Sequence, residues 1–201
     1  MGYRHSKDEI LQAATAVALE HGVAALTFAA VGKRLGISDR TVVYYFPTKD
    51  ALVVSVVRAL GAELERLLEA AFGAEPLSPP DLVQRAWPVM ATVDAAPVLA
   101  VYFEIIGLAA GGREPFASLA RASLEWWAAW LTPKILPAAT ATQRSGALAA
   151  IAALDGLLLV RHVLGTEAAE HAAQGAGIVP LTPGSPSRPV APETARERAP
   201  R

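Results

Sequence analysis

Residues 38–45, SDRTVVYY, place hydroxyl, guanidinium and phenol groups in one short run between two apolar segments. A solvent loop has no need of adjacent tyrosines, and a core helix has no need of clustered charges. Hydroxyl and phenol groups can hold a phosphate backbone, an arginine can reach a guanine edge, and a valine can contact a thymine methyl. The candidates for such contacts are Ser38, Arg40, Thr41, Val42, Tyr44, Tyr45 and Lys49. Together they are suited to a nucleic-acid duplex.

The helix signals around this run predict a helix-turn-helix. Thr27 caps a short helix over 28–35, which Gly36 ends. Ser38 then caps a second short helix, over 39–45. A helix this short buries little surface, so its outer side chains are free to enter a major groove. From geometry alone, an ordinary helical corner with surface charge explains the pattern equally well.

Further helix signals flank this pair. Ser6 and Glu9 form a capping box, and the helix that they open ends at Gly22. Thr48 caps a fourth helix, in which apolar residues recur every three or four positions as far as Phe72. The N-terminal part of the chain is therefore predicted to be a small helical domain with a long helix leading out of it.

The rest of the chain is also helical in its period, beyond a proline-rich break at 76–80. We expect further helices at about 81–94, 98–110, 115–131, 141–164 and 166–174. Pro88 is expected to kink or split the first of these helices. From Pro180 on, the sequence is rich in proline and charge without apolar periodicity, which predicts a disordered tail. The predicted fold class is all-α.

Composition excludes several classes of function. The 201 residues are 53% hydrophobic with a net charge of −1, so any nucleic-acid site is a local patch. The absence of cysteine excludes a disulfide scaffold and fits a reducing cytosol. The histidines are not spaced as a metal-binding pair, and the sequence has no nucleophile elbow, phosphate loop or dinucleotide fingerprint. We therefore expect no catalysis, metal or cofactor, and no membrane span because Asp155 interrupts the longest apolar run.

The segment 141–164 is apolar on nearly all sides, so it must be covered on more than one face. One face can pack within its own domain and the other against a second copy of the chain, as a four-helix bundle. The small residues in the segment would permit close approach of the helices. The expected dimer contacts are Ala149, Ala153, Gly156, Leu157, Val160 and Leu164. A central core helix of a monomer is the alternative.

Aromatic residues gather in 87–130, and pockets for drug-sized ligands favour apolar and aromatic walls with a few polar groups. We therefore expect a small hydrophobic ligand among the helices of 81–131. Buried carboxylates such as those of Asp155 and Glu104 need a partner, which a ligand could supply. The expected wall residues are Met90, Tyr102, Glu104, Trp127, Trp130 and Asp155. Pairing across a dimer axis, hydrogen bonding to the backbone and plain core packing are the alternatives.

Residues 6–53 resemble the DNA-binding domain of the tetracycline-repressor (TetR) type of transcription regulator. The positions that carry the resemblance are Ile10, Ala13, Ala14, Gly22, Thr27, Phe28, the run from Val31 to Ser38, Thr41, and the run from Phe46 to Leu52. Thr27 and Phe28 thereby join the candidate DNA contacts. Where the family usually has a tyrosine that touches DNA, this chain has Val43, so we expect the neighbouring tyrosines to take that role. The family also usually has a small non-glycine residue where this chain has Gly32.

The resemblance implies a cytoplasmic, bacterial, ligand-responsive transcription regulator, expected to be a repressor. It implies a homodimer that binds a palindromic operator in double-stranded DNA and is released by a small hydrophobic effector. Residues 1–50 would form the helix-turn-helix DNA-binding domain, joined by a helix over 48–72 to a ligand-binding and dimerisation domain over 51–178, with a tail over 179–201. Ligand entry would alter the tilt of the joining helix. The alternatives are a helical adaptor or ligand-binding protein without DNA function and, least favoured, an enzyme.

Overall fold

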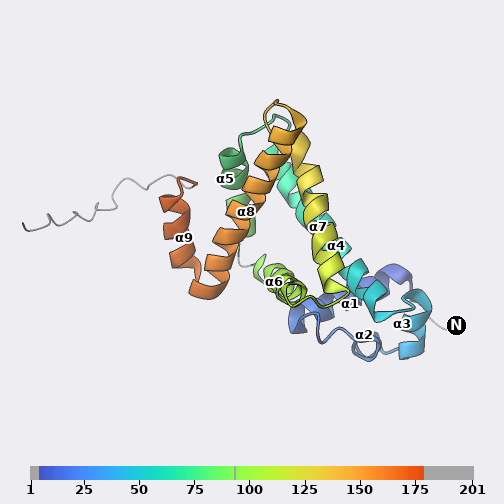
Figure 1. The fold of residues 1–201 in the computed structure, drawn as a ribbon. Coiled ribbons are helices and arrows are strands. Elements are labelled where there is room, and N and C mark those ends of the chain that lie inside the picture. The colour runs from blue at the N-terminus through green and yellow to red at the C-terminus, as the bar shows by residue number, and fades with distance from the viewer. Residues whose placement is uncertain (1–4, 93, 179–201) are drawn as a thin grey trace, which may run out of the picture.

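The computed structural model describes residues 5–92 and 94–178, and this part of the chain is helical without named strands (Figure 1). The helices are α1 (Lys7–His21), α2 (Phe28–Leu35), α3 (Asp39–Tyr45), α4 (Lys49–Phe72), α5 (Pro79–Met90), α6 (Ala96–Ala110), α7 (Phe116–Leu131), α8 (Thr140–Leu164) and α9 (Thr166–Gly175). A 3-10 turn, Thr132–Lys134, follows α7. The all-α prediction is confirmed, and the predicted tail over 179–201 lies outside the described residues.

The local caps explain where the first helices begin. The Ser6 hydroxyl accepts a hydrogen bond from the Glu9 amide at 3.1 Å, and the Glu9 carboxylate accepts one from the Ser6 amide at 2.7 Å. Thr27 and Thr48 likewise accept hydrogen bonds from amides in the first turns of α2 and α4. The predicted cap by Ser38 is wrong. Ser38 stands at the N-cap of α3 without a side-chain cap, and its hydroxyl lies 3.2 Å from that of Thr41.

Pro88 lies inside the single helix α5 and does not split it, and α5 ends two residues later, at Met90. The proline stands in the last turn of α5, so the backbone hydrogen bond that it removes lies at the end of the helix. The helix also begins earlier than expected, at Pro79, since the first helical positions tolerate proline and Ser78 supplies the cap.

The buried residues form two clusters. One cluster joins α5, α8 and α9 with the distal parts of α4 and α7. The other joins α1 to α3 with the first half of α4, and it continues into α6 and α7 through Val101, Ile105 and Leu119. In Figure 1, α1 to α3 lie at one end and α5, α8 and α9 at the other, with α4 running between them. The core of the N-terminal helices is thus completed by residues far along the chain.

Helix α8 carries much apolar surface that the monomer leaves open. It is long and apolar enough to cross a membrane by length and composition alone, which corrects the expectation that no segment is. Only 22% of its most apolar stretch is buried. The exposed large residues on it are Leu148, Leu159, Val163 and Leu164. These side chains, together with the exposed small residues between them, are called the open strip on α8 below.

Candidate nucleic-acid interface and ligand pocket

The turn between α2 and α3 holds the two helices close together. Gly36 adopts the left-handed conformation with φ 68°, which ends α2. The Ile37 amide then donates to the Gly32 carbonyl at 3.0 Å. A Cβ built on Gly32 would lie 2.8 Å from the Ile37 carbonyl oxygen, closer than real Cβ atoms approach. The backbone of the turn therefore occupies the space that a side chain on α2 would need.

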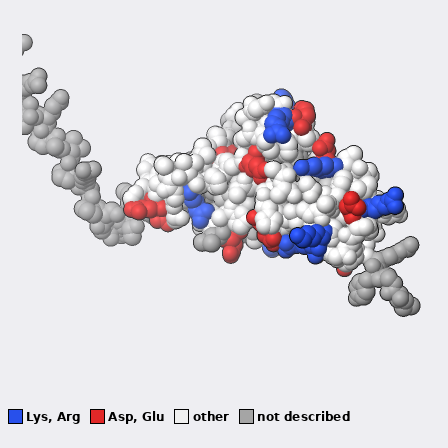
Figure 2. Space-filling view, turned by 90° about the horizontal axis from the view of Figure 1, so that it is seen from below, with Lys and Arg blue, Asp and Glu red and all other residues white. Residues whose placement is uncertain are grey.

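The outer face of α3 presents polar and aromatic groups to solvent. Tyr44 is 80% exposed, and Arg40 is exposed with no ion-pair partner among the described residues. The paired hydroxyls of Ser38 and Thr41 lie at the start of the same helix. Figure 2 views the molecule from below, the side on which α2 and α3 lie in Figure 1, and shows basic and acidic groups interspersed. The basic groups on this face form no single large patch.

Three predicted DNA contacts face inward. Val42 is completely buried, so its expected contact with a thymine methyl is wrong. The Tyr45 hydroxyl donates to the His5 carbonyl at 3.0 Å, which turns this half-buried ring toward the start of α1. Phe28 is half-buried and packs against the N-terminal core. A seven-residue helix buries one face and exposes the other, and the sequence pattern did not assign these residues to the buried face.

The flanking polar groups are partly committed to the fold. The Thr27 hydroxyl caps α2, and the Lys49 ammonium lies 3.4 Å from the Ala24 carbonyl. Arg34 makes two hydrogen bonds of 2.8 Å to the Glu20 carboxylate, which hold α2 against α1. Both groups are exposed. The hydrogen bonds between them lower the pKa of Glu20 and raise the pKa of Arg34.

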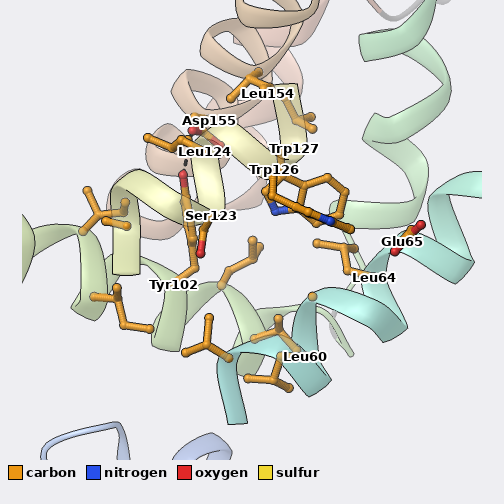
Figure 3. A pocket seen from close by; sticks show the side chains of 18 of the residues that line it. Leu60, Leu64, Glu65, Tyr102, Ser123, Leu124, Trp126, Trp127, Leu154 and Asp155 are labelled. Carbon is orange, nitrogen blue, oxygen red and sulfur yellow. Dashed lines mark hydrogen bonds between the residues drawn. The ribbon is translucent and has the colours of Figure 1, made fainter. Parts of the chain in front are cut away.

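A cavity of about 780 Å³ opens between α4, α5, α6, α7 and α8 (Figure 3). Its walls are mainly aliphatic and aromatic side chains, with Trp126 and Trp127 packed edge to face at 4.7 Å between ring centroids. Four predicted wall residues line it: Met90, Tyr102, Trp127 and Asp155. Its size and apolar character fall within the range of small-molecule sites.

One polar pair stands out in this apolar wall. The Tyr102 hydroxyl donates to the Asp155 carboxylate at 2.8 Å, as the dashed line in Figure 3 marks. Burial raises the pKa of Asp155, and the hydrogen bond from Tyr102 opposes that rise. Burial, followed by the nearby carboxylate, raises the pKa of Tyr102, which keeps the phenol protonated as the donor.

Two predicted pocket residues lie elsewhere. The Glu104 carboxylate accepts hydrogen bonds from the amides of Val23 and Ala24, at 2.7 and 2.9 Å, so it binds the connection between α1 and α2. Trp130 is not among the lining residues. It packs against Phe72 at 5.8 Å between centroids and lies under the Lys134 ammonium. Both assignments were wrong, because Glu104 meets the α1–α2 connection and Trp130 meets Phe72 of α4, and both of these partners are distant in sequence.

The sequence reasoning missed part of the wall. Trp126 lines the cavity and stacks on Trp130 with an interplanar angle of 9°, although the sequence analysis did not predict it as a wall residue. Helix α4 also contributes lining residues, among them Val57, Leu60 and Leu64. The apolar repeat of α4 continues beyond the part that the N-terminal helices cover, and this pattern could have indicated that α4 lines the cavity.

The predicted dimer residues of α8 divide between surface and core. Leu157 is buried in the monomer, which corrects its assignment to an interface. Val160 is half-buried. The exposed members are Ala149, Ala153, Gly156 and Leu164.

The α2–α3 pair, with its exposed outer face, has the arrangement of a helix-turn-helix. Residues 10–56 match the family model described as bacterial regulatory proteins, tetR family. The similarity to this family therefore covers α1 to α3 and the first turns of α4. Among curated proteins, none matches the chain significantly.

Solved structures share the fold. A transcriptional regulator from Rhodococcus sp. Rha1 is 24% identical with a TM-score of 0.66, over 88% of this chain and 100% of that one. The multidrug binding protein EbrR, solved in complex with imidazole, is 22% identical with a TM-score of 0.65, over 92% and 96%. A TetR transcriptional regulator from Legionella pneumophila is 19% identical with a TM-score of 0.62, over 88% and 97%. At these identities the likeness establishes the architecture.

Proposed function

We propose that the protein is a cytoplasmic, homodimeric repressor that binds a palindromic DNA operator and releases it when a small hydrophobic effector enters the cavity. The observation that carries this proposal is the combination of an exposed α3 with an apolar cavity whose walls include α4 and α6. Ser38, Arg40, Thr41 and Tyr44 are the DNA contacts that we retain.

The dimer is supported by charge and by exposed apolar surface. Residues 1–50 carry six Lys or Arg and five Asp or Glu, so one helix-turn-helix has little electrostatic attraction for DNA. Two copies on a two-fold axis multiply the contacts and match a palindrome. The open strip on α8, with Leu159 49% and Val163 67% exposed, is the surface that we assign to the partner copy.

Two helices, α4 and α6, join the cavity to the N-terminal helices and could transmit an effector's binding to α3. Helix α4 lines the cavity along its middle and distal turns and packs against α1 at its N-terminal end. Helix α6 carries Tyr102 in the cavity wall and Glu104 on the α1–α2 connection. An effector that displaces either helix would change the separation of the two copies of α3. The effector can weaken DNA binding only by the factor by which its affinity for the non-binding conformation exceeds its affinity for the DNA-binding one.

A titration against a randomised pool of duplexes, at two salt concentrations, tests the DNA function. The variants are Arg40→Ala and Tyr44→Ala, with Arg144→Ala on α8 as a matched control remote from α3. We expect the wild type and the control to enrich a palindrome and both α3 variants to bind it more weakly. The logarithm of the affinity should fall with the logarithm of salt by roughly 0.9 per phosphate contacted.

Enrichment of no sequence, or equal binding by all four proteins, would contradict the DNA function. A helical adaptor or ligand-binding protein would then be the better description, since neither needs the exposed face of α3. Arg40→Ala and Tyr44→Ala should in that case retain whatever partner binding the wild type shows.

A further inference from the structure

We propose that the effector is a lipophilic amine, whose protonated nitrogen pairs with the Asp155 carboxylate while its apolar body lies against Trp126 and Trp127. This inference rests on the proposed effector site and names its ligand class. It starts from a carboxyl group that the fold leaves incompletely paired inside an apolar cavity.

The Asp155 carboxylate has one hydrogen-bond partner among the described residues, the hydroxyl of Tyr102. Within the same residues, no Lys, Arg or His approaches it within 4.0 Å. A phenol is a neutral donor, and a desolvated carboxylate with a single neutral donor is costly to bury. The carboxylate therefore lacks a cationic partner, and its position on the cavity wall allows a ligand to supply one.

The charges of the cavity favour a cation over an anion. Its ionisable lining groups besides Tyr102 are Arg58 and Glu65 of α4 and Asp155 of α8, which leaves a formal excess of one negative charge. Figure 3 shows Glu65 and Leu64 on the opposite side of the tryptophans from the Tyr102–Asp155 pair. An acidic ligand at the Asp155 end would thus meet a carboxylate of like charge.

The aromatic wall strengthens the same preference. Trp126 and Trp127 line the cavity, and the faces of indole rings attract cations as well as aromatic ligand bodies. Aliphatic side chains such as Leu154 and Leu158 cover much of the remaining wall, so a strongly polar cation would not be bound. The ligand that satisfies both parts combines a basic nitrogen with a large apolar group.

A matched pair of probes tests the class: 2-(2-naphthyl)ethylamine, which is protonated at neutral pH, and 2-(2-naphthyl)ethanol, which is neutral. Affinities are measured by titration calorimetry on the full chain without DNA. We expect the wild type to bind the amine about 10-fold more tightly than the alcohol or better, since an ion pair in a desolvated site exceeds a neutral contact. Asp155→Asn should bring the two affinities close to parity.

Two further variants keep the result interpretable. Glu63→Gln, on α4 outside the cavity, should retain the full preference for the amine. Asp155→Glu should retain a preference for it even if Asp155→Asn unfolds. Equal binding of both probes by the wild type would overturn the amine while leaving an apolar effector site intact. A preference that survives in folded Asp155→Asn, or binding of neither probe at millimolar concentration, would also overturn it. The DNA titration above is independent of each of these outcomes.

Discussion

Gly32 sets how closely α2 and α3 approach each other. A Cβ at this position would lie 2.8 Å from the Ile37 carbonyl oxygen and 3.3 Å from the Asp39 amide, both of them backbone atoms that have little freedom to move. We predict that Gly32→Ala lowers the free energy of unfolding by about 1–3 kcal/mol, the usual cost of overpacking. It should also weaken operator binding, because α3 must shift. Denaturant unfolding and a DNA titration measure the two effects.

Gly107 of α6 provides the control for this substitution. It lies within a helix, and a Cβ there would meet no atom within 4 Å. Gly107→Ala should therefore leave stability unchanged or raise it by up to about 1 kcal/mol, as helix propensity requires. Equal effects of the two substitutions would show that the close approach at Gly32 is relieved at no cost.

Asp155 should make stability depend on pH. Burial raises the pKa of its carboxyl in the folded protein, and the hydrogen bond from Tyr102 partly offsets this. The folded state then binds the proton more tightly than the unfolded chain, so stability falls as pH rises from about 3.9 through the raised folded pKa. We predict that Asp155→Asn is more stable than the wild type at pH 7.

The difference in unfolding free energy between these two proteins should shrink as the pH falls toward about 3.9 and vanish below it, where the wild-type carboxyl is protonated in both states. Denaturant unfolding of both proteins across this range measures the difference. A gap that stays constant with pH would mean that the carboxyl ionises equally easily in the folded and unfolded states.

At the scale of elements, α6 connects the cavity with the N-terminal helices. The Glu104 carboxylate binds the Val23 and Ala24 amides, and a Cβ on the neighbouring Gly22, which has φ +81°, would lie 2.7 Å from the same carboxylate. We predict that Glu104→Gln lowers the free energy of unfolding by about 1–3 kcal/mol, since hydrogen bonds to a charged group are lost. It should also weaken operator binding, because the α1–α2 connection loses its anchor.

Glu125→Gln is the matched control for this change. Its carboxylate pairs with Arg144 at an exposed position, with the glutamate side chain 62% accessible, so its loss should alter stability little. Denaturant unfolding compares the two variants, and the DNA titration shows whether the effect reaches α3. Unchanged stability and operator affinity in Glu104→Gln would show that α6 does not hold the helix-turn-helix in place.

At the scale of the whole molecule, the open strip on α8 should hold two copies together. We predict a mass in solution of twice the 21.0 kDa chain, and a monomer after Val163→Glu, because a charge would be desolvated between apolar helices. Light scattering coupled to size exclusion measures the mass. The monomer should stay folded, since Val163 is 67% exposed, and it should bind the operator weakly.

Leu67→Glu, at a 41% exposed position of α4, makes the same chemical change outside α8. This variant should remain a dimer and keep its affinity for DNA. A wild type that is monomeric at micromolar concentration, or a Val163→Glu variant that stays dimeric, would contradict the assignment of this surface.

The sequence by itself determined the helices and their order. Ser6 with Glu9, Thr27 and Thr48 act within one turn of the chain, so local composition suffices to place these starts. The apolar repeat likewise predicted a helix over 141–164, and α8 begins one residue earlier, at Thr140. Ser78 and the two prolines after it also set the start of α5 locally, but the helix was predicted to begin at 81, two residues later than it does.

The tertiary structure alone decided which side chains face one another. Val42 and Tyr44 stand two positions apart and are equally plausible DNA contacts by sequence, but packing of α3 on the N-terminal core buries Val42 and leaves Tyr44 exposed. Glu104 meets amides 80 and 81 residues away, and Tyr102 meets Asp155 across 53 residues. Caps and periodicity act over a few residues, whereas these contacts exist only once distant helices have packed, so no local pattern specifies them.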